Sequence, residues 1–337
     1  MHNKVYINAI KQISAQQFLS DNWFEQPVLY TEQYVQALDP DYKQFFTPNE
    51  VRRFGKILKR ALLVSRLVMK ESEISSPDAI ITGTGLGCVE NTEIFLNKLV
   101  FEGEELLNPT YFMQSTHNTI SSLIAIDSKC YSYNNTFSHK GISFECALQD
   151  AFIQMKTNNI QTALVGAFDE LTPTYFKFLK KINFLGQSNQ TFAGETSVAM
   201  MLTSAKSEKS LCEIEFVEKV YSKNLQKKHI DFLPDNIDYL MIGTNGDVKN
   251  DNIFLENCEI FFPNIPLLQY KHIFGEGYTV PAFGVYASSL CMKNGLIPEH
   301  LILNKSAKSQ YSKKISKILC YNQFEGKHHT FILLSKC

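Results

Sequence analysis

The chain lacks any apolar run close to the roughly 18 residues that a membrane helix needs. Residues 1–20 also lack the basic start and the continuous apolar stretch of a secretory signal. We therefore expect a soluble protein in the cytoplasm, with no membrane partner. The chain also lacks an excess of either charge. Its formal net charge of -1 over 337 residues gives no global attraction to nucleic acid or anionic lipid.

The chain also lacks paired cysteines. Its eight cysteines stand singly, without the CxxC pairs of a zinc site or the density of a disulfide scaffold. We interpret most of them as small buried apolar side chains, and we expect no metal and no cofactor. What is present is 44% hydrophobic residues against 20% charged ones, a balance that argues against disorder and allows a large core.

One helix start is explicit in the sequence. Thr47 is a suitable N-cap, Pro48 suits the first helical position, and Glu50 can return to the cap. The apolar spacing that follows predicts one helix continuing to Lys70. Its other face is basic, with Arg52, Lys56, Lys59, Arg66 and Lys70. We interpret this stripe as a solvated face, and a docking surface for an acidic carrier protein is the alternative.

A pattern of strand, glycine turn and helix occurs twice. Residues 79–85 and 239–246 are apolar runs that meet glycines, and residues 138–148 and 278–290 each follow a turn and indicate helices rich in small residues. The polar run at residues 205–211 separates the two copies. The sequence therefore predicts an α/β protein built by duplication, with halves at 1–205 and 206–337.

Six motifs identify the pattern further. They are AIITGTGLGCVENTE (79–93), NNTFSHKG (134–141), AGETSVAMMLTS (193–204), MIGTNGD (241–247), GYTVPAFG (277–284) and FEGKHHTFILL (324–334). In this order and spacing they resemble the β-ketoacyl synthases of the thiolase superfamily. The resemblance implies a thiolase-like fold, a duplicated five-layer αβαβα arrangement.

The resemblance also implies a reactive cysteine and two histidines, and this chain has none of them. The matching positions are Ser138, Ile242 and Tyr278. A serine hydroxyl needs an adjacent base to attack a thioester, an isoleucine cannot carry a proton, and a tyrosine with a pKa near 10 is a poor base at neutral pH. Because such residues act as a unit, we expect no intact catalytic site and no condensation by this chain alone.

Substrate-binding positions also follow from the resemblance. The motifs that border the acyl tunnel and the partner subunit in the family contain Phe112, Met113, His117, Phe137 and Phe324. We interpret His117 as a packing or hydrogen-bonding residue, since the other members of a proton relay are missing. The same matches predict that Ser138 and Tyr278 lie at the N-terminal ends of two central helices that face one pocket.

A condensing-enzyme scaffold without its triad resembles the chain-length factors, which are inactive partners of active ketosynthases in polyketide and aryl-polyene systems. This resemblance implies a heterodimer through residues 134–151, an acyl carrier protein as a further partner, and a tunnel closed by apolar side chains. Three alternatives stay open. They are a serine acyltransferase that uses Ser138, a homodimeric acyl-binding module, and an active synthase with an unusual triad.

Overall fold

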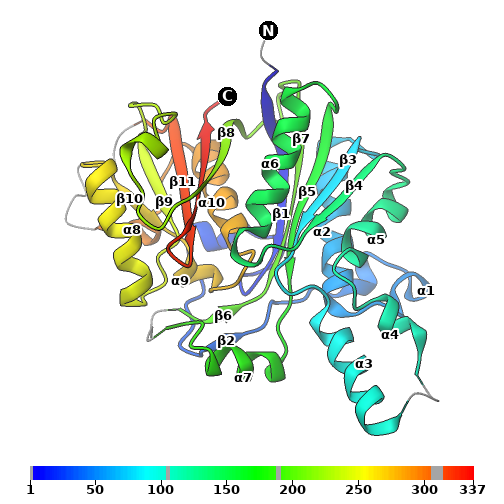
Figure 1. Ribbon diagram of the computed structural model, residues 1–337. Helices are drawn as coiled ribbons and strands as arrows, with labels where there is room; N and C mark the ends of the chain where they lie inside the picture. Colours follow the sequence, from blue (N-terminus) through cyan, green and yellow to red (C-terminus); the bar gives the residue numbers. More distant parts are fainter. Residues whose placement is uncertain (1–2, 104–106, 187–190, 305–313) are drawn as a thin grey trace.

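The computed structural model describes residues 3–103, 107–186, 191–304 and 314–337, and it is built around one large mixed sheet (Figure 1). Its ten strands are β1 (Val5–Ile13), β3 (Ala79–Gly83), β4 (Tyr133–Phe137), β5 (Thr162–Asp169), β7 (Thr196–Thr203), β8 (Cys212–Tyr221), β9 (Tyr239–Ile242), β10 (Leu267–Gln269), β11 (Lys317–Phe324) and β12 (His328–Ser335). A separate two-stranded pair joins β2 (Tyr34–Val35) to β6 (Ala193–Gly194).

The α-helices lie between these strands. They are α1 (Pro48–Val51), α2 (Lys56–Ser72), α3 (Val89–Glu102), α4 (Pro109–Met113), α5 (Thr119–Ser128), α6 (Ser143–Lys156), α7 (Pro173–Lys181), α8 (Val248–Phe261), α9 (Lys271–Phe274) and α10 (Pro281–Asn294). Short 3-10 helices span Asp21–Phe24, Tyr42–Gln44, Lys140–Ile142, Lys227–His229 and Glu299–Leu301.

The strand order repeats within the sheet. Across the sheet the order is β10-β9-β11-β12-β8-β1-β7-β5-β3-β4. If the five strands of each half are numbered in chain order, both halves read third, second, fourth, fifth and first from the outer edge inward. The first strand of each half, β1 or β8, lies at the centre, and these two strands pair with each other. In each half the second, third and fourth strands pair in parallel and the fifth is antiparallel. This repetition is what an internal duplication produces. We keep the division between residues 205 and 206, which lies between β7 and β8, as a proposal.

Helices cover both outer faces and fill the space between the half-sheets. Helices α2 and α5 pack on the β1–β7–β5–β3–β4 half, and their apolar residues form a core cluster with that face. Helix α8 supplies Phe254 and Cys258 to the cluster on the outer face of the other half. Between the halves, α6 and α10 contact each other and both half-sheets (Figure 1). The five-layer αβαβα arrangement is thus confirmed.

The predicted helix from residue 48 to residue 70 is wrong as a single element. The capping interaction forms, since the Glu50 carboxylate accepts hydrogen bonds from the Thr47 backbone N (2.6 Å) and Oγ1 (2.7 Å). However, α1 ends at Val51 and a new helix starts after Gly55, which is the extended N-cap of α2. A glycine in a helix interior is unfavourable, and here it separates two helices.

Two residues of the predicted basic stripe, both on α2, have partners at the surface. Arg66 pairs with Asp127 and Glu50, and the Lys59 ammonium lies 6.0 Å from the centre of the Tyr42 ring. Sequence reasoning missed Arg60, which is fully buried on the same helix and pairs with Asp39 and Glu195. The spacing of the charges could not separate this buried arginine from its exposed neighbours.

The structure also bears on the expectations about cysteines and membrane helices. All eight cysteines are free, and every one except Cys337 is buried, which confirms their interpretation as small core side chains. Among the described residues, no helix is both long and apolar enough to cross a membrane.

Candidate functional site

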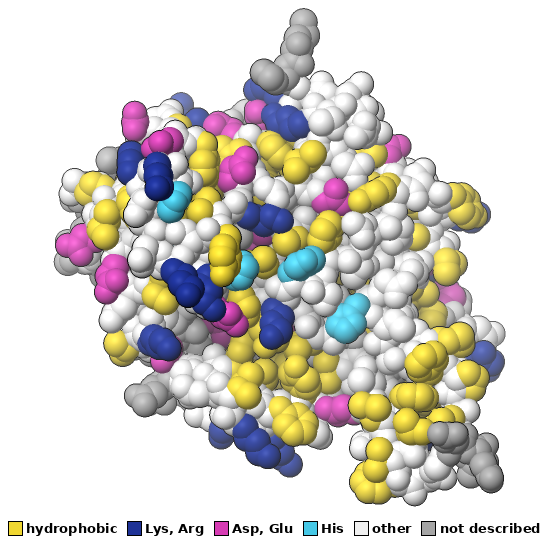
Figure 2. Space-filling view, viewed as in Figure 1, with side chains coloured by type: hydrophobic (Ala, Val, Ile, Leu, Met, Phe, Trp, Pro, Cys, Tyr) yellow, Lys and Arg dark blue, Asp and Glu magenta, His cyan; other side chains and the backbone are white. Residues whose placement is uncertain are grey.

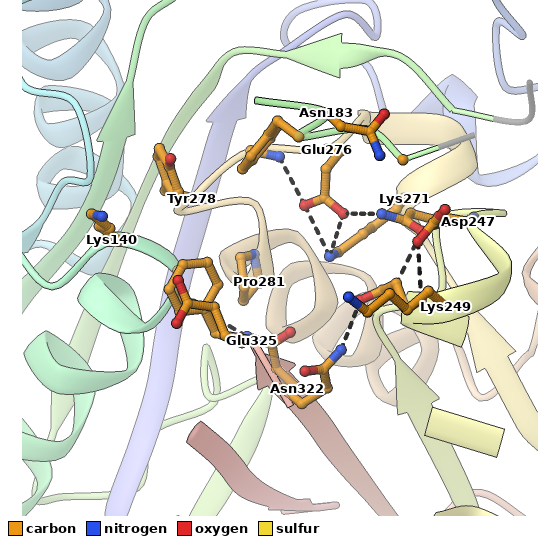
Figure 3. Close-up of a pocket in the computed structure, with 18 of the residues that line it drawn as sticks. Lys140, Asn183, Asp247, Lys249, Lys271, Glu276, Tyr278, Pro281, Asn322 and Glu325 are labelled. Carbon is orange, nitrogen blue, oxygen red and sulfur yellow. Dashed lines mark hydrogen bonds and ion pairs between the residues drawn. The ribbon is translucent and has the colours of Figure 1, made fainter. Parts of the chain in front are cut away.

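A cavity of about 890 Å³ opens where the two halves meet at the ends of their central helices. Its walls come from the turn before α6, the chain after α7, the start of α8, the segment between α9 and α10, and the β11–β12 hairpin. Figure 3 shows the side chains that converge on this space. Because elements from both halves build it, the cavity is the candidate functional site.

The floor of the cavity is a buried ion pair. The Lys271 Nζ lies 2.9 and 2.8 Å from the two carboxylate oxygens of Glu276, and the two side chains are 6% and 9% exposed. Glu276 also accepts hydrogen bonds from the Asn245 Nδ2 (2.7 Å) and from the Gly277 backbone N (3.0 Å). With these partners the carboxylate is saturated, so this ion pair is a structural element rather than a free acid or base.

Side-chain amides form one wall. The Asn250 Nδ2 donates to the Asn245 Oδ1 (3.0 Å), and the Gln323 Nε2 donates to the Asn250 Oδ1 (2.7 Å). Asp247 is the N-cap of α8 and accepts from the Asn250 backbone N, while Asp251 accepts from the backbone N of Asn245. The turn after β9 is therefore held by its own side chains at the start of α8.

Asp169 joins the two halves directly beside the cavity. Its carboxylate accepts hydrogen bonds from Thr84 Oγ1 and the backbone N of Gly85 and Leu86 in the first half, and from Thr279 Oγ1 (2.7 Å) in the second. Burial raises the pKa of this carboxyl, and these four donors oppose that rise. Asp169 thus fixes the glycine turn after β3 against the residue that follows Tyr278.

Tyr278 lines the cavity, just before α10 begins at Pro281. Its ring packs edge-on against Phe184 at 5.0 Å and Phe324 at 6.1 Å between ring centres. Gly85 is required beneath it, because a Cβ at that position would lie 2.3 Å from the Tyr278 Cβ. Burial raises the pKa of Tyr278 to about 12, which keeps the phenol protonated at neutral pH.

Ser138 lies outside the lining of the cavity. It is exposed and follows β4, five residues before α6 begins at Ser143, so the predicted helix over residues 138–148 starts later than expected. Among the described residues, no hydrogen bond links its hydroxyl to a basic side chain. His139 instead turns its ring toward Phe137, at 6.0 Å between ring centres, and its backbone N donates to the Ser143 Oγ (2.8 Å).

The segment that carries Ser138 is nevertheless close to Tyr278. The Thr84 backbone N donates to the Phe137 carbonyl (3.0 Å), and the next residue, Gly85, touches Tyr278. Gly141 lies against Phe324, since a Cβ there would be 2.3 Å from the Phe324 ring. Lys140 and Gly141 line the cavity, so the turn after β4 forms one edge of it.

Ile242 is the last residue of β9 and is completely buried. It stands in register with Gln269 on one side and Tyr321 on the other, and it belongs to the core cluster under α8. An aliphatic side chain in this place packs the core and offers no hydrogen bond.

The other residues expected from the resemblance are divided between two regions. Phe324 lines the cavity, whereas Phe137 is half-buried against the central core. Phe112 and Met113 on α4 are 56% and 61% exposed, and His117 is exposed beside Gly87. With the exposed Leu96, Val100 and Phe101 of α3, the α4 side chains form an apolar surface, seen at the lower right of Figure 2.

The remaining histidines near the final hairpin have structural partners. His329 is buried, with its Nδ1 2.9 Å from the Tyr321 hydroxyl and its Nε2 3.1 Å from the Ser222 carbonyl. Burial lowers the pKa of His329. His328 packs against Tyr221 at 5.0 Å between ring centres. Neither histidine is among the described residues that line the cavity.

Beneath the cavity, α6 carries a buried glutamate. The Glu145 Oε1 accepts hydrogen bonds from the Asn322 Nδ2 (2.7 Å) and the Thr330 Oγ1 (3.1 Å). Burial raises the pKa of Glu145 to about 7, although these donors favour its charged form. Within the described part of the chain, the Glu145 Oε2 and the Asn322 Oδ1 have no hydrogen-bond partner. Asn322 lines the cavity, but its Oδ1 is buried against Gly243 and offers no acceptor to the cavity.

Sequence reasoning missed the residues that build the floor. Nothing in the sequence pairs Lys271 with Glu276. Asp169 ends β5 without a motif of its own, and Asn322 lies next to Gln323 near the end of a mostly apolar buried strand. A polar residue inside a buried strand is the one local signal that could have marked Asn322.

The chemistry of the cavity is therefore restricted. Its described lining contains lysine, asparagine, aspartate, glutamate, glutamine, glycine, proline and apolar or aromatic residues, and no cysteine, serine or histidine. The described residues contain no cluster of three or more histidine, cysteine or acidic side chains suited to a metal ion. Such a lining can bind and orient a ligand, but it offers no pair of nucleophile and base.

Comparisons with known proteins identify solved structures with the same fold. No curated protein matches the chain in sequence. The ishigamide ketosynthase/chain length factor superposes with a TM-score of 0.82 at 12% identity over 100% of both chains. A β-ketoacyl synthase from Burkholderia phymatum has a TM-score of 0.80 at 13% identity, over 99% of this chain and 100% of that one.

A third structure is the ketosynthase ApeO in complex with its chain length factor ApeC, from Xenorhabdus doucetiae. It superposes with a TM-score of 0.76 at 13% identity, over 99% of this chain and 98% of that one. These likenesses establish the fold. The family model for the β-ketoacyl synthase N-terminal domain matches residues 23–241, which is more than half of the chain. With its thiolase-like fold, this chain therefore belongs to the β-ketoacyl synthase family.

Proposed function

We propose that this chain is a non-catalytic, chain-length-factor-like subunit that pairs with an active β-ketoacyl synthase and shapes its acyl tunnel in fatty acid or polyketide-type biosynthesis. The observation that carries the proposal is the absence of cysteine, serine and histidine from the described lining of the cavity. The three positions matched to the triad, Ser138, Ile242 and Tyr278, offer no thiolate and no imidazole. Condensation needs both groups acting together.

The exposed edge of strand β4 favours binding to another protein. Strand β4 ends the strand order, so one of its edges has no neighbouring strand among the described residues. Around this edge Tyr131, Ile126 and Ile153 are 90%, 75% and 51% exposed. An uncovered strand edge flanked by apolar side chains favours pairing with another chain. We propose that residues 134–151 and this edge form the interface with the active subunit.

The apolar surface of α3 and α4 is the basis for proposing that this chain shapes an acyl tunnel. Phe112 and Met113 are more than half exposed in the single chain, together with Phe101 of α3. A partner that covers these side chains would bury them beside its own acyl tunnel, where a fixed volume stops a growing chain. The other expected partner is the acyl carrier protein that delivers the substrate, and the assembly would operate in the cytoplasm.

A Ser138-dependent acyltransferase is the second candidate. It requires a base within hydrogen-bond reach of the Ser138 hydroxyl, and the His139 ring faces Phe137 instead. A homodimeric acyl-binding module is the third candidate, and it would use the same β4 edge with a second copy of this chain. Neither candidate explains the loss of all three triad residues as directly as an inactive partner does.

Co-expression with candidate ketosynthases tests the proposal. We expect this chain to co-purify with one of them as a heterodimer, and we expect Tyr131→Lys at the β4 edge to break the complex. Phe178→Lys on α7, where the side chain is 54% exposed, is a control on another surface. A stable homodimer that binds no ketosynthase would favour the binding module, and acyl-enzyme formation that disappears in Ser138→Ala would favour the acyltransferase.

A further inference from the structure

Charge is unevenly distributed along the chain, although the formal net charge is only -1. Between Glu170 and Glu195 the sequence contains three lysines and no acidic residue. The lysines, Lys177, Lys180 and Lys181, lie on α7, and all three are exposed. Helix α7 therefore carries a local positive charge that the composition of the whole chain does not reveal. Net charge alone gives no reason to exclude binding of this helix to an anionic surface.

Large apolar side chains accompany these lysines on the outer side of α7. Phe178 is 54% exposed, and Ile182, the C-cap of the helix, is 67% exposed. The Lys181 Nζ lies 5.8 Å from the centre of the Phe178 ring. The lower edge of the molecule in Figure 2 shows lysine and apolar side chains together, at the place of α7 in Figure 1. Exposed apolar side chains beside lysines on one helix are typical of surfaces that bind membranes.

The inner side of α7 holds the helix on the body of the protein. Leu179 is 3% exposed, and the Tyr175 backbone N donates to the Oγ1 of Thr172, the N-cap, at 3.0 Å. The ring of Phe176 stacks on Tyr34 at 5.1 Å between ring centres. Because these contacts fix the helix through its inner side, the outer side remains available to another surface.

The outer side of α7 continues to the rim of the cavity. Ile182 lines the cavity, and Val248 and Lys249 line it from the start of α8. Val248 is 71% exposed, and Lys249 is exposed as well. Two acidic side chains of the lining also reach the surface, but Asp247 caps α8 and Glu325 pairs with a neighbouring lysine. Apolar and basic side chains therefore extend from α7 to the rim.

We propose that the outer side of α7 binds the surface of a bilayer that contains anionic phospholipids. Phe178 and Ile182 enter the region of the headgroups, and the three lysines lie near the lipid phosphates. Bound in this way, the chain turns the rim of its cavity toward the bilayer. A bilayer accepts projecting apolar side chains without a matching pocket, whereas an acidic protein partner would need one. The inference is independent of the proposed function, because the single chain presents all of these side chains.

Sedimentation of the full chain with lipid vesicles tests the proposal. We expect binding to vesicles of equal parts phosphatidylglycerol and phosphatidylcholine, and none to vesicles of phosphatidylcholine alone. Each lysine near an anionic surface contributes about fivefold to the affinity, so Lys177→Gln, Lys180→Gln and Lys181→Gln together should weaken binding about 100-fold. Phe178→Ala should weaken it about 3- to 10-fold, since part of this side chain is already covered in the free chain.

A second lysine-rich segment provides the matched control. Lys223, Lys227 and Lys228 are exposed in the connection between β8 and β9, and Asp231 and Asp235 follow them in the sequence. Changing these three lysines to glutamine alters the net charge as much as the triple variant of α7 does. We expect this control to bind vesicles as the parent does, because charges farther than about 8 Å from the bilayer are largely screened at physiological salt.

A tryptophan placed on α7 reports on insertion directly. Trp23 is the one tryptophan of the sequence and is 1% exposed, so Phe178→Trp adds a single fluorophore at the surface. We expect its emission to shift to shorter wavelength on the anionic vesicles and to be quenched by brominated lipid chains. The amphipathic indole ring favours the boundary between headgroups and hydrocarbon.

Three results would overturn the inference. They are an absence of binding to the anionic vesicles, equal losses in the two triple variants, and unchanged emission of Phe178→Trp on vesicles that bind the chain. If no vesicles bind and the triple variant of α7 instead weakens binding of an acyl carrier protein, the helix recognises an acidic protein. None of these results bears on condensation. Conversely, ketoacyl synthesis by the chain alone would remove the proposed function and leave vesicle binding intact.

Discussion

The starts of α6 and α10 occupy equivalent places in the two halves, yet they differ in almost every physical respect. Helix α10 follows a buried segment in which Lys271 pairs with Glu276 and Thr279 bonds to Asp169 of the other half. Helix α6 follows an exposed turn in which Ser138, His139 and Lys140 all face solvent.

The difference shows which of the two helix starts is stabilised by contacts within the chain and which is exposed to solvent. In the second half, the polar groups at the helix start are satisfied by contacts within the chain, so no other subunit is needed to cover them. The first half leaves its helix start beside β4, one edge of which pairs with no strand that the structure describes. We infer that the first half is the side that another subunit covers, and that the second half maintains the cavity.

The largest expected effect comes from breaking the buried ion pair of the second half. Lys271→Met leaves the Glu276 carboxylate buried without its counter-charge, which costs about 3 to 5 kcal/mol of unfolding free energy. Urea denaturation measures this loss. Lys327→Ala, which removes a pair with Glu325 at an exposed position, should cost less than about 1 kcal/mol.

A double variant sharpens the test of the ion pair. Lys271→Met combined with Glu276→Leu removes both charges and should recover most of the lost stability, since no unpaired carboxylate remains. Equal stability of Lys271→Met and the Lys327→Ala control would show that the buried pair does not hold the second half together.

The first half contains its own buried charge, and its effect depends on pH. Burial raises the pKa of Glu145 from 4.5 to about 7. Between these values the folded protein binds one more proton than the unfolded chain, so stability falls as the pH rises through this window. Below it the effect is absent. The decline amounts to roughly 3 kcal/mol at pH 8.

Glu145→Gln should remove this decline, so that the variant gains stability relative to the parent above pH 7 and not below pH 4.5. Denaturation curves at several pH values measure the difference. Glu256→Gln, on the exposed side of α8, should leave the pH profile of the parent unchanged. If the decline persists in Glu145→Gln, the buried proton lies elsewhere.

The sequence predicted the fold well because its evidence is local. Glycine turns after β3 and β9 and the two small-residue helices repeat within the chain, and this repetition together with the family resemblance predicted a duplication. The floor of the cavity could not be predicted, because Lys271 and Asn322 lie on separate elements of the second half, α9 and β11, and come together only in the folded chain. The contacts of Asp169 could not be predicted either, because they join turns from both halves. The late start of α6 was missed as well, because a 3-10 helix at Lys140–Ile142 precedes it.

The apolar surface of the first half gives a smaller but specific effect. Phe112→Ala and Met113→Ala should change the stability of the chain alone by less than about 0.5 kcal/mol, since both side chains are exposed. In the assembled complex each should lengthen the product, which mass spectrometry of the carrier-bound chain detects. Phe178→Ala on α7, at 54% exposure, is the control that should leave product length unchanged. Unchanged product length in all three variants would leave Phe112 and Met113 as ordinary surface residues.

The smallest effect is expected at the triad position itself. Ser138→Ala should change the free energy of unfolding by less than about 0.5 kcal/mol and leave acyl-thioester labelling at background. Ser143→Ala, five residues later, should cost about 1 kcal/mol, since the buried Ser143 hydroxyl donates to the Lys140 carbonyl and accepts from the His139 backbone N. A reversed order of these two effects would contradict the contrast between an exposed turn and a closed helix start.

The most direct test of the account is a condensation assay on the purified chain with acyl and malonyl carrier proteins, run with and without a ketosynthase that co-purifies with it. We predict no ketoacyl product from the chain alone, and product in the complex that is lost when the partner's nucleophile is removed. Turnover by the chain alone, surviving in Ser138→Ala, would show a catalytic group that the cavity lining does not reveal and would contradict the account.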